Sequence, residues 1–303
     1  MGVERDPRWG SIQILQRRCK GEITMTTTAL TPEQVIAEVK ASDSQKVKLA
    51  ITDADGILRG KYIHKSKFLS AAESGFGFCN VVFGWDCADV CYDNVDYTGW
   101  HSGYPDAQAR IDLGTYRKVP WDDGVPFFLG DFVDGEGNPL GVCPRQVLKR
   151  VIDKAKSMGF CPQTSVEYEF FNFLETPQSL HDKGFRDLTP LTPGMFGYSV
   201  LRASQNQPYF AALMDELLAF DIPLEGIHTE TGPGVFEAAI IYSDPLEAAD
   251  RAVLFKAASK EVAARFGIIP TFMAKIDTAL PGCGGHIHQS LWDSDLEKNV
   301  FYD

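Results

Sequence analysis

Residues 282–292 have the sequence Gly-Cys-Gly-Gly-His-Ile-His-Gln-Ser-Leu-Trp, in which two histidines follow a glycine-rich approach. The glycines let the backbone come close to a ligand, and residues two apart on a strand share one face. A lone histidine is more often a satisfied core residue, but a His-x-His pair after such a loop favours a ligand role. The segment therefore predicts a strand whose His286 and His288 border a binding site.

A second segment, Val166-Glu167-Tyr168-Glu169-Phe170, places two glutamates on one face of a predicted strand. Two like charges among aromatic residues are costly unless a cation or basic partners neutralise them. The plain alternative is an exposed polar face at the edge of a sheet. The strand alone leaves both interpretations open.

A third segment, residues 230–237, has the sequence Glu-Thr-Gly-Pro-Gly-Val-Phe-Glu, with carboxylates at both ends of a turn that brings two strand ends together. By itself it fits a plain exposed hairpin. The three segments are better explained as one site. Hard oxygen ligands with a single imidazole favour magnesium or manganese over zinc, and such ions normally hold nucleotide phosphates.

Composition excludes several classes of function. The chain has 303 residues, and its 29 basic and 41 acidic side chains give a net charge of -12, which argues against binding of nucleic acid or anionic lipid. No apolar run is long enough to span a bilayer. The seven cysteines form neither a Cys-x-x-Cys pair nor a regular framework, which favours a reducing cytoplasm over a secreted disulfide scaffold.

Turn and periodicity signals divide the chain into three parts. Residues 1–29 are polar and irregular, and we expect a disordered extension. Residues 30–137 are expected to form a β-rich domain with a helix over 31–40, a hairpin around the turn at 53–56 and short apolar runs such as 81–83. Residues 142–303 are expected to form a second domain, with a strand over 164–173 and helices over 144–157, 207–220 and 244–266.

These segments, in this order, resemble the metal and nucleotide signatures of the glutamine synthetase family, and the resemblance covers about residue 30 to the end. Residues 53–61, Asp-Ala-Asp-Gly-Ile-Leu-Arg-Gly-Lys, are similar to the first-domain stretch of the branch that includes γ-glutamyl-polyamine and related amine ligases. The resemblance implies an α+β fold. A small N-terminal β-grasp-like domain would precede an incomplete catalytic domain with a curved antiparallel sheet and flanking helices.

The resemblance also implies roles for the matching side chains. One metal would be held by Glu169, Glu230 and Glu237, and a second by Glu167 and His286. The predicted ATP contacts are Glu225, Tyr242, His288 and Ser290, and the backbone of Gly282 would face glutamate. Because the second metal has only two ligands in this chain, we expect the first site to be the better formed one.

Asp86 matches the aspartate with which the family binds and deprotonates ammonium, in the active site of the neighbouring subunit. An ordinary loop carboxylate is the plain alternative. The resemblance thus implies a ligase that uses Mg²⁺ or Mn²⁺ and ATP to join glutamate to ammonia or a small amine. It implies a cytoplasmic, ring-forming homo-oligomer, dodecameric in full-length relatives, and no partner among nucleic acids or membranes.

Two features depart from the family's pattern. The usual Phe-Asp-Gly-Ser-Ser is here Trp-Asp-Cys-Ala-Asp at residues 85–89, and Pro281 replaces an asparagine beside the glutamate substrate. Both departures weaken the case for ammonia and leave room for a larger amine or a different acid. The chain also ends at Asp303, whereas the family continues with further substrate arginines and a metal-ligating glutamate. We therefore expect a fragment with little activity of its own.

Three alternatives to the ligase were considered. The first is a non-catalytic structural member of the same family, as the lens member is. The second is a cupin-type site with two histidines and Asp293, which leaves the four glutamates unexplained. The third is a guanidino kinase, a class that lacks the His-x-His signature.

Overall fold

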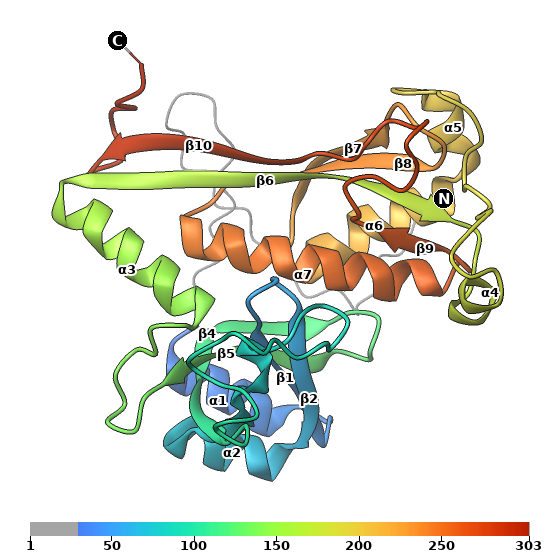
Figure 1. Ribbon diagram of the computed structural model, residues 1–303. Coiled ribbons are helices and arrows are strands. Elements are labelled where there is room, and N and C mark those ends of the chain that lie inside the picture. Colours follow the sequence, from blue (N-terminus) through green and yellow to red (C-terminus); the bar gives the residue numbers. More distant parts are fainter. Residues whose placement is uncertain (1–29, 303) are drawn as a thin grey trace, which may run out of the picture.

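The computed structural model describes residues 30–302, so the predicted extension over residues 1–29 lies outside the described part. Two five-stranded sheets, with helix α7 (Pro245–Ala264) between them, form the body of the molecule (Figure 1). The fold is of the predicted α+β class. Within residues 30–302, no helix has both the length and the apolar character that crossing a membrane requires.

The first sheet has the strand order β2-β1-β5-β4-β3, in which β1 and β5 are parallel and the other neighbours are antiparallel. This arrangement agrees with the predicted β-grasp-like character. Its elements are α1 (Pro32–Ala41), β1 (Lys46–Thr52), β2 (Leu58–His64), α2 (Lys65–Ser74), β3 (Phe76–Cys79), the 3₁₀ helix η1 (Asn80–Phe83), β4 (Asp106–Val119) and β5 (Val125–Val133). The apolar run at 81–83 therefore forms a short helix within the β-rich part.

Apolar residues of β5 alternate between two buried faces. Phe128 and Phe132 pack with α1 and α2, whereas Phe127 and Leu129 pack with α6 (Gln207–Ala219) and α7. All nine residues of β5 are buried. A strand that is covered on both faces of its sheet usually has few polar residues. β5 has one charged residue, Asp131.

The second sheet has the order β10-β6-β8-β7, with β9 also paired to β6, and all its pairs are antiparallel. Its strands are β6 (Phe160–Phe173), β7 (Leu224–Thr229), β8 (Val235–Ile240), β9 (Ile269–Thr271) and β10 (Gly285–Asp293). Three more helices, α3 (Pro144–Ser157), α4 (Pro177–Asp182) and α5 (Val200–Gln205), complete this part. β6 begins four residues before the prediction because β10 pairs with it as far as Phe160.

One core connects the two sheets. Phe255 of α7 lies 5.9 Å from both Tyr168 and Phe170 of β6, measured between ring centroids. The opposite side of α7 and α6 packs against Ala50 and Phe127 of the first sheet. The division into domains at 30–137 and 142–303 remains a prediction, and the core crosses that division.

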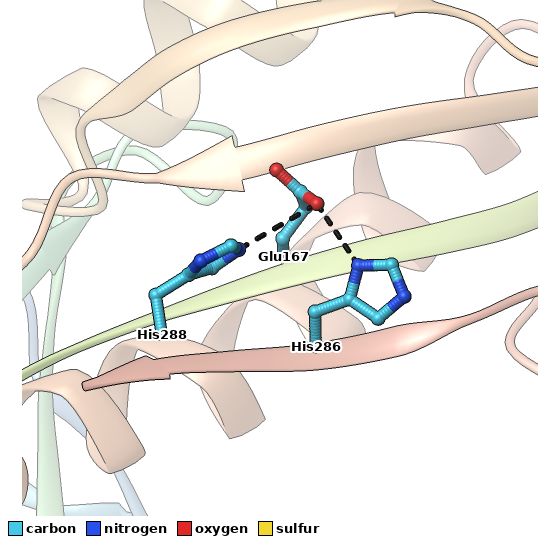
Figure 2. A group of neighbouring side chains, drawn as sticks. All are labelled: Glu167, His286 and His288. Carbon is cyan, nitrogen blue, oxygen red and sulfur yellow. Dashed lines mark hydrogen bonds and ion pairs between the residues drawn. The ribbon is translucent and has the colours of Figure 1, made fainter.

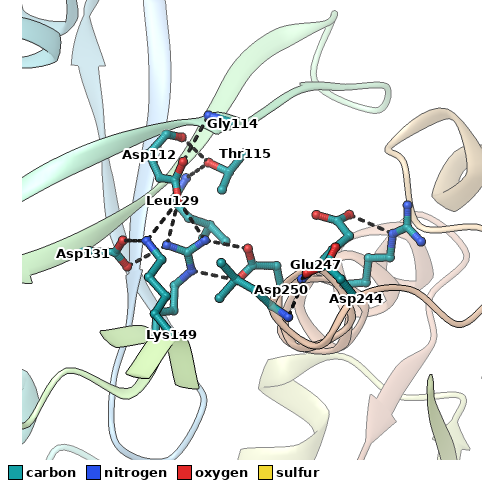
Figure 3. Close-up of polar contacts among 12 residues, drawn as sticks. Asp112, Gly114, Thr115, Leu129, Asp131, Lys149, Asp244, Glu247 and Asp250 are labelled. Atoms are coloured by element: carbon teal, nitrogen blue, oxygen red, sulfur yellow. Dashed lines mark hydrogen bonds and ion pairs between the residues drawn. The ribbon is translucent and has the colours of Figure 1, made fainter. Parts of the chain in front are cut away.

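A buried ionic cluster joins the same parts. The Arg145 guanidinium of α3, which is 5% exposed, donates two hydrogen bonds to Asp250 of α7, at 2.7 and 2.8 Å. It also donates to Asp131 of β5 at 2.6 Å and to Asp112 of β4 at 3.2 Å (Figure 3). Burial opposes this charge, but the carboxylates, Asp250 first, raise the pKa of Arg145 above its usual range. Arg145 thus links the first sheet, α3 and α7.

Candidate metal centre

Glu167 and Glu169 lie on the face of β6 that points away from α7. Tyr168 and Phe170, which alternate with them, pack against Phe255 of α7, and successive strand side chains point to opposite faces. On the neighbouring strand, His286 lies opposite Glu167. The carboxylates and imidazoles therefore gather on the face of the second sheet that is turned away from the first sheet.

The first group of possible metal ligands consists of Glu167, His286 and His288, whose donor atoms lie within 4.8 Å of one another (Figure 2). Glu167 Oε1 is 3.1 Å from His286 Nδ1 and 3.7 Å from His288 Nε2. Burial opposes ionisation of Glu167, but its hydrogen bonds and the neighbouring rings hold its pKa below the usual value. The same carboxylate raises the pKa of His286.

The second group consists of His228, Glu230 and Glu237. His228 on β7 lies opposite Glu237 on β8, and its Nε2 is 3.5 Å from Glu237 Oε2. Oε1 of Glu230 accepts a hydrogen bond from the Thr231 amide at 2.6 Å. Oε2 of Glu230 is buried and has no hydrogen-bond partner in residues 30–302. A buried carboxylate oxygen without a donor is the position that a cation would occupy.

A carboxylate pair joins the two groups. Burial, together with the neighbouring Glu167 carboxyl group, raises the pKa of Glu237 to about 7. Two adjacent carboxylates share a proton when no cation neutralises them. Carboxylate oxygens with few imidazoles are the donors of magnesium and manganese sites, so these residues fit such ions.

Glu169 belongs to neither group, although it lies directly opposite Glu237. It lies instead beside Gly284, where an added Cβ would stand 2.9 Å from Glu169 Oε1 and 2.7 Å from His286 Nε2. A larger residue at this point would require one or both of these side chains to move. The proposed set of Glu169, Glu230 and Glu237 remains a prediction, and the structure adds His228 beside its last two members.

Two residues of the site were not identified from the sequence. His228 lies two residues before Glu230, so period-two spacing in the Ile-His-Thr-Glu run could have indicated it. Tyr198 stacks on His228, with ring centroids 4.4 Å apart, and the charge of Glu230 raises its pKa. Tyr198 lies in an irregular segment before α5, where no periodic signal marks it.

The predicted nucleotide residues lie toward one end of the sheet. His288 and Ser290 follow His286 on the same face of β10, opposite Ser165 and Gln163 of β6. The other two lie at the end of the β7–β8 hairpin that is remote from Glu230 and Glu237, namely Glu225 near the start of β7 and Tyr242 just after β8. The four positions thus extend from the acidic groups in one direction.

The remaining two predicted residues lie elsewhere. Gly282 precedes β10 at the opposite end from Ser290, where its Cα lies close to the Ala274 carbonyl. Asp86 lies in the first-sheet part, and its carbonyl oxygen accepts a hydrogen bond from Arg59 of β2 at 3.2 Å. Asp86 therefore belongs to the first-sheet part, whereas the acidic groups lie on the face of the second sheet that is turned away from the first sheet.

Comparison with known proteins gives consistent matches. Residues 141–303 match the family described as glutamine synthetase, catalytic domain. The chain is 52% identical over 269 residues to type-1 glutamine synthetase 2 of Dictyostelium discoideum, covering 89% of this chain and 51% of that protein. It is 36% identical to the glutamate–isopropylamine ligase of a Pseudomonas species, covering 82% of this chain and 54% of that protein.

A solved structure of GmaS in complex with ADP matches with a TM-score of 0.73 at 24% identity, over 89% of this chain and 58% of that one. This likeness confirms the predicted fold. The chain spans about half the length of the curated relatives it matches. The cupin and guanidino kinase alternatives find no support in these matches. The signatures that carried the resemblance and the match over 141–303 agree, and the chain belongs to the glutamine synthetase family.

Proposed function

We propose that this protein is an ATP- and metal-dependent ligase that joins the γ-carboxylate of glutamate to ammonia or a small amine. The observation that carries the proposal is the pair of adjacent ligand groups joined through Glu167 and Glu237. Oε2 of Glu230, buried and without a hydrogen-bond partner in residues 30–302, supports a cation at this place. A catalytic role is favoured over a purely structural one because a protein without metal chemistry gains nothing from clustered carboxylates.

Glu167 and His286 would hold one ion, and Glu230 and Glu237, with Glu169, the other. When bound, Mg²⁺ or Mn²⁺ would neutralise the negative charge on ATP and on the transferring phosphoryl group. His288 and Ser290, farther along the same face, would contact the ATP phosphates and nucleoside, with Glu225 and Tyr242. The Gly282 backbone would orient glutamate at the other end.

The reaction would have two steps. The γ-carboxylate of glutamate attacks the γ-phosphoryl group of ATP and releases ADP, and an amine then displaces phosphate from γ-glutamyl phosphate. Asp86 would bind the ammonium form and take up its proton. Holding the two substrates in line is the chain's main contribution, because positioning supplies a large part of such rate enhancements.

Asp86 lies beside β2 of the first sheet, whereas the acidic groups lie on the face of the second sheet turned away from the first, which supports active sites formed between subunits of a homo-oligomeric ring. A second copy would then supply Asp86. The six cysteines in residues 30–302 are all free, which supports the proposed cytoplasmic location.

The function is tested by measuring the release of phosphate from ATP in the presence of glutamate. The assay uses protein expressed from the complete gene. Ammonia, methylamine, ethanolamine, putrescine and isopropylamine are compared as acceptors. We expect one amine to stimulate release well above background. If no amine does so, the ligase assignment fails, and the structural member of the family becomes the better interpretation.

The metal centre is tested by Glu169→Ala. We expect this change to abolish binding of one Mn²⁺, because it removes a hard oxygen ligand. Glu73→Ala, which removes an exposed carboxylate from α2, is the matched control and should bind Mn²⁺ normally. Mn²⁺ titrations followed by electron paramagnetic resonance give the stoichiometry. Absence of Mn²⁺ binding in the unchanged protein would favour the structural alternative.

Metal binding should depend on pH. Since the pKa of Glu237 is raised to about 7 and that of His286 is also raised, protons occupy these ligands below neutrality and a cation must displace them. Mn²⁺ affinity should therefore fall by about tenfold per pH unit below pH 7. Calorimetry at pH 6.5 in buffers of different ionisation enthalpy should show proton release, which should become small at pH 8.5. Equal release at both values would contradict the assignment.

A further inference from the structure

The loop that carries Asp86, residues 84–92, is tied to the β1–β2 hairpin by one guanidinium group. Arg59 on β2 donates from Nε to Asp53 Oδ2 at 2.8 Å and from Nη1 to Asp89 Oδ1 at 2.6 Å. Its Nη2 donates to the Asp86 carbonyl oxygen at 3.2 Å. All three nitrogens of the group therefore bind acceptors, two of them in the loop.

Asp53 is a fixed anchor for this guanidinium. Its side chain is 1% exposed, and its Oδ1 accepts hydrogen bonds from the amides of Asp55 at 3.0 Å and Ile57 at 2.8 Å. Its Oδ2 accepts from Arg59. A buried carboxylate is tolerated only when it is paired, so Asp53 and Arg59 hold each other in place.

The loop side of the contact fixes the backbone around Asp86. Oδ1 of Asp86 accepts hydrogen bonds from the amides of Ala88 at 2.8 Å and Val90 at 2.9 Å. Asp89 has a φ of 63°, a left-handed conformation uncommon outside glycine, and Arg59 binds its carboxylate. Both of these hydrogen bonds use Oδ1, which leaves Oδ2 of Asp86 for a ligand.

The Arg59 guanidinium also lies over the Trp85 ring, 4.8 Å from its centroid. Stacking and three hydrogen bonds together require a planar group with several donors. A lysine would supply one flexible charge and could not meet these acceptors at once. The site therefore uses the geometry of arginine as well as its charge.

We infer that Arg59, anchored by Asp53, is a positioning residue that holds Asp86 in place for capture of the amine. This inference rests on the proposed function, because that function gives Asp86 its role. A carboxylate that binds an ammonium group must present its oxygen at a fixed point, and a displacement of about 1 Å can cost about 100-fold in rate. Loss of the Arg59 guanidinium should therefore raise the KM for the amine and leave the KM values for glutamate and ATP unchanged.

The contact of Arg59 with Asp53 and the 84–92 loop is tested by amide hydrogen exchange without substrates, in protein expressed from the complete gene. In Arg59→Lys we expect the amides of Ala88 and Val90 to exchange at least about tenfold faster, since local opening becomes easier. Arg110→Lys, which changes an exposed arginine of β4, is the control and should leave them unchanged. Asp53→Asn should reproduce the effect of Arg59→Lys. Unaltered exchange in both variants would show that Arg59 does not fix the 84–92 loop.

The positioning role is tested by kinetics of the same variants with the best amine. We expect Arg59→Lys to raise the KM for the amine at least about tenfold, with the KM values for glutamate and ATP within about twofold. Arg59→Lys combined with Asp86→Asn should be no worse than Asp86→Asn alone, because both act through one group.

Additive losses, or an unchanged KM for the amine, would overturn the positioning role. If the unchanged protein releases no phosphate with any amine, the proposed function fails, and with it the role in amine capture. The hydrogen-exchange measurement still decides whether Arg59 fixes the loop. The two failures are therefore distinguishable.

Discussion

Replacing Arg145 with methionine should lower the free energy of unfolding by about 3–5 kcal/mol, the usual cost of breaking a buried ion pair by removing one partner. The reason is that Asp131 and Asp250, both nearly inaccessible to solvent, would lose the guanidinium that neutralises them. Asp112 and Asp131 would keep Lys149 as a cationic partner, whereas Asp250 would lose both of the hydrogen bonds that Arg145 donates to it. Urea denaturation followed by tryptophan fluorescence measures the change.

Arg150→Met is the matched control, because it removes an exposed arginine from the same helix. Its effect should stay within about 0.5 kcal/mol, as surface substitutions usually do. If the two variants unfold at the same urea concentration, the cluster around Arg145 does not stabilise the fold.

Replacing Glu237 with glutamine should have opposite effects on metal binding and on stability. Mutation of outer-shell residues costs about 10- to 100-fold in metal affinity, so loss of a direct ligand should cost at least about 100-fold, with a similar loss of activity. The metal-free protein should nevertheless become more stable at pH 8, by about 1–3 kcal/mol. Glutamine cannot ionise beside Glu167 and can still donate a hydrogen bond to it.

The pH dependence of this gain has a defined sign. Because the pKa of Glu237 is raised in the folded protein to about 7, its contribution to stability is present at low pH. It is lost as the pH rises from the pKa of the unfolded chain through 7. The Tm of Glu237→Gln should therefore exceed that of the unchanged protein only slightly at pH 5, and by its largest amount at pH 8. Glu73→Gln should leave the Tm unchanged at both pH values. An equal rise in Tm for Glu237→Gln at pH 5 and pH 8 would contradict a proton shared by Glu167 and Glu237.

Period-two spacing predicted the parts of the site that lie within one strand. The shared face of Glu167 and Glu169 and the strand that carries His286 follow from it, because neighbours on a strand have fixed directions. The register between strands does not follow, since it depends on pairings between residues far apart in the sequence. The sequence therefore did not show that His228 and Glu237 would meet.

Tertiary contacts account for the other differences. Arg145 lies in the helix predicted over 144–157, but nothing in that helix indicates three aspartates from other elements. The apolar run at 81–83 has β-forming residues, yet it forms a turn of helix that covers the core beside Phe132. Local propensity is a weak guide where packing decides the conformation.

Strand β5 has a consequence for synthesis of the chain on the ribosome. Both faces of Val125–Val133 are covered in the folded molecule, and one cover is α7, which ends at Ala264. The end of that helix is translated about 130 residues after the strand, roughly 6 to 26 s later at ordinary elongation rates. Until α6 and α7 have been made, the apolar face that they cover is exposed, and such segments are aggregation hazards. Newly made chains are therefore most exposed to aggregation at this stage, before any acidic site has formed.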